Sequence, residues 1–532
     1  MPRPFNMRSP VVLTVVVTIA ICSALLILPG ATATSRYFND LLIFLDGGYR
    51  VVEGQVPNRD FHTALGPLSF YLPGFGYWVT GNLGLAMPVG LAALMIVTAP
   101  IMIHVLGTRV RPLIAVPWAI FLLLLMITPV NTGEMVMNIS FAMFYNRIGW
   151  ALIGLLLIMH LRPERPLRHQ VACDTLAATA LTLMMLYTKA TYGVVALVFL
   201  FLMLLHPVQR RWAAAAILLT GLSGAVIEMF WGGTRMHIAD LAVASNVSAV
   251  LPLRDYVVSL LETSGEYIVF ACLAGLALWQ RGRFTDFLFY GFCLGAGYAL
   301  LMQNFQVRGI VTLLAGGVVA AEHLSRQWRQ GLTYSVDMMT RGAALLVIVL
   351  MLPVGLSSAA ALGLHATMVA TGAGIALNTP NGKDIRVVNT LDDGQFKFYA
   401  NYAESLEKGV AVLESLSPPP TKVLVMDFVS PMTSLVGLNP PQGGTAWMHD
   451  GRNFDADFHF SADALLGGVD VIMIPKRPIA ESTTDLMEEL YGPYIGKHFK
   501  AVRQTRLWRV YQRQEPPLLP TEDFWNAAHV PR

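Results

Sequence analysis

Two aspartates that follow the first long apolar run of the 532-residue chain are its leading candidates for chemistry. Asp40 stands closest to the end of that run, where a carboxylate could face an anionic lipid head group or accept a proton. On a helix that turns about 100° per residue, Asp40 and Asp46 lie about 120° apart and do not share a face. The sequence leaves the choice between these two carboxylates open.

A second set of polar side chains lies in the loop after the first apolar run or at the ends of apolar segments on the same side of the membrane. Ionisable groups are costly inside a membrane, so their gathering on one side predicts a polar cavity open to that side. Lys189, Arg308 and Arg59 are candidates to hold an anionic phosphate, although Lys189 could equally be an interfacial anchor. The expected ligand-binding residues are Arg59, Asp60, His62, Glu134, Lys189, Tyr192, Gln303 and Arg308.

The composition excludes an ordinary soluble protein. Hydrophobic residues make up 55% and charged residues 13% of the chain, and the mean hydropathy is +0.54. Soluble domains carry roughly 25% charged residues. The net charge of +3 is too small to indicate nucleic acid binding, and the 4 cysteines lie within apolar segments without metal-ligand spacing.

Apolar runs of about 17–25 residues are needed to cross a bilayer, and the sequence predicts about eleven such spans. With the N-terminus inside, the inner connections hold 14 Lys and Arg residues and the longer outer connections hold 8. This bias predicts a cytoplasmic N-terminus and an extracytoplasmic C-terminus. The expected spans are 11–29, 85–106, 113–130, 146–162, 171–188, 191–206, 212–231, 257–279, 285–302, 309–323 and 342–362.

Two regions are not expected to span. The outer loop 30–84 is long enough to be functional, and its segments 37–53 and 67–80 suit helices at the membrane surface. After residue 362 the composition turns polar. Alternating strands at 422–428 and 469–474, with helices near 400–416 and 481–491, predict a soluble α/β domain over 363–532. The fold class is therefore a polytopic α-helical membrane protein, residues 1–362, with a C-terminal extracytoplasmic α/β domain.

Other motifs are weaker. Asp455 and Asp457 form a DxD pattern, but it lies in a loop-rich stretch of the tail. His449 and His459 have no specific metal spacing and are assigned to loops. His104, His160 and His206 approach inner span ends and are interpreted as interfacial residues.

The first outer loop carries a family resemblance. An acidic residue after the first span is followed by Gly54-Gln55-x-Pro57-x-Arg59-Asp60-Phe61 and by Gly66-Pro67-Leu68. This pattern resembles the GT-C-fold glycosyltransferases, specifically the branch with protein O-mannosyltransferases and the lipid A aminoarabinose transferase. The resemblance covers about residues 10–110. It implies inverting transfer of a sugar from a polyprenyl-phosphate donor to an acceptor on the outer face, with the first-loop aspartate as general base, a position that Asp40 occupies.

That chemistry would require a carboxylate for the proton of the attacking hydroxyl and cations for the departing phosphate. The expected partners are a polyprenyl-phosphate sugar as co-substrate, a glycan, lipid or protein acceptor and membrane lipids, with no nucleic acid. The sequence assigns no resident metal, and it leaves open whether the reaction uses a divalent metal ion. We expect the protein in the bacterial inner (cytoplasmic) membrane.

Two alternative functions are weighed. A multispan transporter or a lipid or glycan flippase would show inverted repeats. A polymerase or ligase of O-antigen would place its large functional loop late in the chain.

Overall fold

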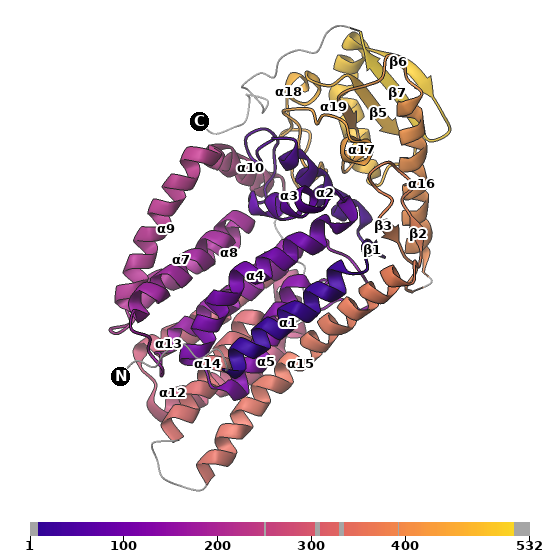
Figure 1. Cartoon of the computed structure of the whole chain (residues 1–532). Helices are drawn as coiled ribbons and strands as arrows, with labels where there is room; N and C mark the ends of the chain where they lie inside the picture. Colours follow the sequence, from indigo (N-terminus) through magenta and orange to yellow (C-terminus); the bar gives the residue numbers. More distant parts are fainter. Residues whose placement is uncertain (1–8, 249–251, 304–308, 329–334, 392, 515–532) are drawn as a thin grey trace.

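The computed structural model describes residues 9–248, 252–303, 309–328, 335–391 and 393–514. Its larger part is a bundle of apolar helices, and a smaller α/β part sits at one end of the bundle (Figure 1). The bundle helices are α1 (Pro10–Ile27), α4 (Leu83–Arg109), α5 (Pro112–Ile127), α6 (Phe144–Leu157), α7 (Gln170–Thr188), α8 (Ala190–Leu204), α9 (Arg210–Trp231), α11 (Leu253–Glu262), α12 (Ser264–Arg281), α13 (Phe284–Gln303), α14 (Val311–Trp328) and α15 (Ser335–Ala370).

Among the described residues, 6 helices are long and apolar enough to cross a membrane, or 7 if α11 and α12, which meet at 64°, form one broken span. Each predicted span coincides with a helix or with this bent pair, which confirms a polytopic helical membrane protein. The expected number of about eleven crossings is not confirmed. The segment Phe144–His160, which is the 14-residue α6 with the 3-residue 3₁₀ turn after it, shows why, because it rises only about 25 Å against a hydrocarbon core of about 30 Å.

The outer loop forms two helices, as predicted. They are α2 (Phe38–Val52) and α3 (Leu68–Thr80), and the short strand β1 (Thr32–Thr34) precedes them. Gly81 ends α3 with a φ of +63°, a conformation that glycine adopts without strain. Asn82 then accepts a hydrogen bond from the Gly84 N–H and begins α4. A further helix, α10 (Thr234–Val247), lies at the same end of the bundle (Figure 1).

The C-terminal part is an α/β unit, as the sequence predicts. A four-stranded sheet has the order β4-β5-β7-β6, with β4 and β5 parallel and Val423 opposite Val471. A second sheet has the order β1-β3-β2, so the first outer loop contributes a strand to it. The elements are β2 (Ile375–Ala376), β3 (Ile385–Val387), α16 (Gly394–Glu414), β4 (Val423–Val425), α17 (Met432–Val436), α18 (Ala462–Leu466), β5 (Val471–Pro475), α19 (Glu481–His498), β6 (Phe499–Gln504) and β7 (Trp508–Arg513). A domain division at residue 363 stays a prediction; α15 itself ends at Ala370.

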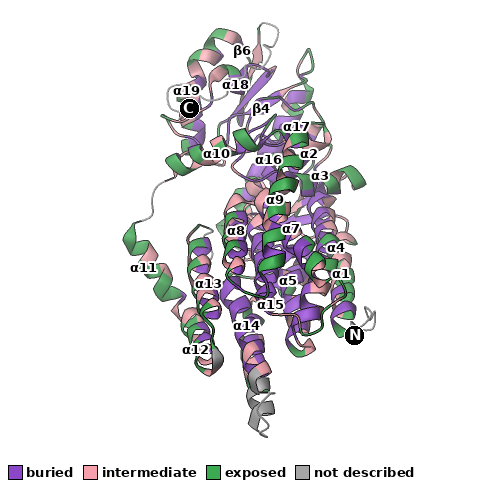
Figure 2. Ribbon diagram, turned by 90° about the vertical axis from the view of Figure 1, so that its left-hand side faces the viewer, coloured by how far each residue is buried: buried purple, intermediate pink, exposed green. Residues whose placement is uncertain are grey.

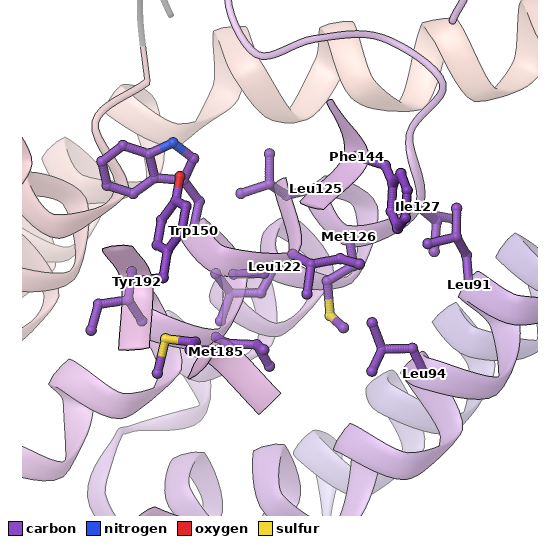
Figure 3. Packing of buried hydrophobic residues seen from close by; sticks show 14 of the residues in the cluster. Leu91, Leu94, Leu122, Leu125, Met126, Ile127, Phe144, Trp150, Met185 and Tyr192 are labelled. Carbon is purple, nitrogen blue, oxygen red and sulfur yellow. The ribbon is translucent and has the colours of Figure 1, made fainter. Parts of the chain in front are cut away.

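The interior of the bundle is packed with apolar side chains, and several of its outer faces are apolar as well. Figure 3 shows Leu122, Met126 and Trp150 in the buried cluster. Exposed residues line the outward sides of α9 and α12 (Figure 2), where Met229 is 83% and Trp279 is 84% exposed. Large apolar side chains facing outward suit contact with lipid rather than water.

Candidate active site

A pocket of about 390 Å³ lies where the end of the helical bundle meets the C-terminal part. Its walls come from α2, α6, the junction of α7 and α8, the end of α13 and loops of the C-terminal part. The lining residues are Tyr37, Asn39, Asp40, Ile43, Phe44, Leu65, Met143, Tyr145, Asn146, Lys189, Gln303, Phe428, Trp447, His449 and Arg452. The structure therefore brings together three residues singled out in the sequence, namely Asp40, Lys189 and Gln303.

Asp40 lies in the first turn of α2 and presents its carboxylate to this pocket. Its Oδ1 accepts a hydrogen bond of 3.0 Å from Asn39 Nδ2. Burial raises the pKa of the Asp40 carboxyl from 3.8 to about 7, because desolvation disfavours the charged form. A carboxyl with a pKa close to neutral pH can exchange a proton in either direction, which is the property of an effective general base or acid.

Lys189 lies between α7 and α8, outside both helices, where the backbone is extended with φ −153° and ψ 117°. Its Nζ donates a hydrogen bond of 3.0 Å to Asn146 Oδ1 and lies 5.4 Å from the centre of the Tyr145 ring. Burial lowers the pKa of the Lys189 ammonium from 10.5 to about 8. The group therefore stays mainly protonated at pH 7 and supplies a positive charge to the pocket.

The Gly66-Pro67-Leu68 motif holds the break between α7 and α8. The Gly66 N–H and the Ser69 hydroxyl both donate to the Thr188 carbonyl, at 3.1 and 2.9 Å. These bonds satisfy a carbonyl at the helix end that has no partner within α7. A Cβ atom on residue 66 would overlap with the Tyr187 carbonyl, so only glycine fits this approach. The motif thus positions Lys189 indirectly.

Asp46, the other candidate base, does not line the pocket. Its Oδ2 forms a buried ion pair of 2.7 Å with Arg50 Nε, one helical turn further along α2. Arg50 Nη1 also donates to the Pro441 carbonyl at 3.1 Å, and Gln55 Nε2 donates to the carbonyl of Pro440 at 3.0 Å. Asp46 therefore belongs to a polar network that attaches the outer loop to the C-terminal part.

The C-terminal part supplies one wall of the pocket, mainly with aromatic rings. Phe428, Trp447 and His449 form a cluster in which ring centres lie 5.3 to 6.2 Å apart. Trp447 Nε1 is buried with no hydrogen-bond partner among the residues that the structure describes. A cluster of rings with one unused donor can hold a ligand that has both an apolar face and an oxygen acceptor.

The chain matches no protein-family model and no curated protein. It is similar to the solved structure of ArnT from Cupriavidus metallidurans in the apo state, with 11% identity and a TM-score of 0.47, over 93% of this chain and 97% of that one. It is also similar to the arabinofuranosyltransferase AftD from Mycobacteria, with 14% identity and a TM-score of 0.44, over 98% of this chain and 41% of that one.

Arg59, Asp60 and His62 lie in the outer loop but are not among the residues that line the pocket. Arg59 is exposed and its Nη2 lies 3.3 Å from Asp60 Oδ2, which also accepts a bond from the Val56 N–H. His62 Nδ1 lies 2.7 Å from Asp240 Oδ1 of α10. These contacts order the loop, and a substrate-binding role for its residues stays a prediction.

The remaining residues that the sequence predicts to bind substrate lie at different places relative to the pocket. Glu134 Oε1 accepts a bond of 3.2 Å from the hydroxyl of Tyr37, which lines the pocket. Burial and this carboxylate raise the pKa of Tyr37 to about 12. Tyr192 is buried in the bundle with its ring edge against Trp150, 5.6 Å between centres (Figure 3), and is not a lining residue. Arg308 lies outside the described residues.

Several lining residues were not identified from the sequence. Tyr145 and Asn146 lie in the first turn of α6; Asn146 is the first residue of the expected span 146–162, and Tyr145 stands just before it. His449 was assigned to a loop of the tail, and Trp447 and Arg452 were not singled out. The available signal was a tryptophan, a histidine and an arginine in a stretch rich in glycine and proline, which is typical of a functional loop. Nothing in that stretch indicates which part of the bundle it contacts.

Proposed function

We propose that this protein is a membrane glycosyltransferase that moves a sugar from a polyprenyl-phosphate donor to a hydroxyl acceptor, with inversion at the anomeric carbon. The observation that supports this most directly is the common pocket of Asp40 and Lys189 at one end of an apolar bundle. A proton acceptor and a cation are the two groups that such a transfer needs. The acceptor is a glycan, a lipid or a protein.

In the proposed reaction the acceptor oxygen attacks the anomeric carbon on the face opposite the phosphate. The bond between that carbon and the phosphate oxygen breaks, and both of its electrons leave with polyprenyl phosphate. Asp40 takes the hydroxyl proton. Lys189, which lines the same pocket, stabilises the negative charge that develops on the phosphate.

We place the pocket and the C-terminal part on the outer side of the bacterial inner membrane and the N-terminus in the cytoplasm. Support comes from the basic residues assigned to inner connections, which lie together. Arg326 Nη1 donates to the Arg162 carbonyl at 2.9 Å, and Arg326 Nε lies 2.9 Å from Glu164. A basic end opposite the pocket agrees with the charge preference of cytoplasmic connections.

The test is transfer by the purified protein in lipid nanodiscs, with polyprenyl-phosphate donors that carry different radiolabelled sugars. We expect one donor to yield free polyprenyl phosphate and a labelled acceptor. Asp40→Asn is expected to lower turnover by roughly 10²- to 10⁴-fold while donor binding is retained. Size-exclusion profiles of both proteins serve as the control for folding.

Two results would overturn the proposal. The first is that the correctly folded protein releases no sugar from any donor and instead moves a lipid-linked sugar across the bilayer. The second is full activity of Asp40→Asn together with inactivity of folded Asp46→Asn, which would transfer the role of base to Asp46.

A further inference from the structure

A group of metal-ligand side chains lies at the end of the bundle opposite the pocket. α6 and the 3₁₀ turn after it, Ile158–His160, run from the pocket residue Tyr145 to His160, a rise of roughly 22 Å. His160 meets Asp286 in the first turn of α13 and His323 in α14. One ligand atom of each residue lies within 4.8 Å of those of the other two.

Contacts within the group and with its neighbours Phe289 and Tyr290 set its geometry. His160 Nε2 lies 3.0 Å from Asp286 Oδ1, and its ring stacks on Phe289 with 4.1 Å between centres. The Tyr290 hydroxyl lies 3.2 Å from His323 Nδ1. A hydroxyl or carbonyl on one imidazole nitrogen, which orients the ring, is the usual outer arrangement of a metal-binding histidine.

A nearby histidine–aspartate pair shows what a purely structural arrangement looks like in this protein. Asp174 lies 2.8 Å from His104 Nε2 and 2.7 Å from Arg109 Nη2, and it accepts a bond of 2.9 Å from Gln170. An arginine thus neutralises that carboxylate. Asp286 has no arginine within ion-pair distance among the described residues and faces a second histidine instead.

His160 is only 2% exposed, and its Nδ1 has no hydrogen-bond partner among the residues that the structure describes. His104 Nδ1 in the other pair is also buried without a partner among the described residues, so the difference between the two pairs is the arginine on Asp174. We propose that His160, Asp286 and His323 form a binding site for a transition-metal ion of the Zn²⁺ class. The ion joins the end of α6 to α13 and α14, and this inference does not depend on the proposed glycosyltransferase activity.

The ligand set determines the class of ion. Two imidazoles and one carboxylate suit Zn²⁺, whereas Mg²⁺ and Ca²⁺ prefer oxygen ligands. Tetrahedral Zn²⁺ sets its ligand atoms roughly 3.3 Å apart, so small side-chain rotations close the group around the ion.

The test measures metal content and stability on the full-length protein, purified in detergent and stripped with a chelator. We expect titration with Zn²⁺ to give about one bound ion per chain by mass spectrometry and a higher midpoint of thermal unfolding. Asp286→Asn, which keeps the side-chain size, is expected to abolish the shift. Tyr290→Phe keeps the ring packing and is expected to weaken Zn²⁺ binding by about 10-fold.

His104→Ala is the matched control, because it removes a histidine from the other histidine–aspartate pair at the same end of the bundle. It is expected to retain the bound ion and the thermal shift. The inference is overturned if the folded wild-type protein binds no Zn²⁺. It is also overturned if folded Asp286→Asn and His323→Gln bind the ion as well as the wild type, or if His104→Ala abolishes binding equally.

Discussion

Asp40 and Asp46 belong to the same helix, α2, but Asp40 lines the pocket whereas Asp46 is ion-paired with Arg50 at 2.7 Å. Their separation of about 120° around the helix puts one carboxylate in the pocket and the other beside Arg50. The two aspartates therefore have different physical roles. One is a candidate for proton transfer, and the other neutralises a buried guanidinium.

Asp46→Asn is expected to reduce stability more than chemistry. Arg50 is 1% exposed, and removing one partner of a buried ion pair costs about 3–5 kcal/mol because the other charge is left uncompensated. The midpoint of thermal unfolding should fall, while turnover per folded molecule stays close to that of the wild type. The double variant Asp46→Asn/Arg50→Gln should recover part of the loss. A folded and stable Asp46→Asn protein without turnover would contradict this assignment.

The pKa values of the two pocket groups predict a bell-shaped pH dependence of kcat/KM. Asp40 must be deprotonated to accept a proton, so the rate should rise as the pH passes about 7. Lys189 must be protonated to hold the phosphate, so the rate should fall as the pH passes about 8. Residual activity of Asp40→Asn should lack the rising limb, and Lys189→Arg should move the falling limb to higher pH. A rising limb centred near pH 4 would contradict a buried base.

Local sequence patterns predicted the elements that form from short-range signals. The helices at 37–53 and 67–80 and the strands at 422–428 and 469–474 are found as α2, α3, β4 and β5. Periodicity and turn residues specify such elements before any tertiary contact is made. The number of membrane crossings was less predictable, because apolar runs at 113–130 and 191–206 form helices shorter than a full span.

The site was predictable only where its residues carry a chemical signature. Asp40 and Lys189 are ionisable groups beside apolar runs, so their position in the sequence already indicated a special environment. Trp447 and His449 come to the pocket because Gln55 and Arg50 bind the carbonyls of Pro440 and Pro441. Contacts across such a long sequence separation leave no periodic or spacing signal.

Lys189→Ala is expected to weaken use of the lipid donor. A hydrogen bond to a charged group contributes about 1.5–3 kcal/mol, which corresponds to an increase of about 10- to 100-fold in the KM for polyprenyl-phosphate sugar. The KM for the acceptor should change little. Lys189→Arg keeps the positive charge and should retain most of the donor affinity. If steady-state kinetics show the same donor dependence for Lys189→Ala and the wild type, Lys189 is an interfacial anchor.

Trp447→Phe tests whether the aromatic wall of the C-terminal part binds substrate. The change keeps a ring next to Phe428 and His449 but removes the Nε1–H, which is buried without a partner among the described residues. Loss of one hydrogen bond to a sugar or phosphate oxygen costs about 0.5–1.5 kcal/mol, so one KM should rise by about 2- to 10-fold with kcat unchanged. The matched control is Trp279→Phe, at a tryptophan that is 84% exposed on the bundle surface. Equal kinetics for the two variants would show that the wall only encloses the pocket, whereas an effect confined to the acceptor KM would assign the C-terminal part to acceptor binding.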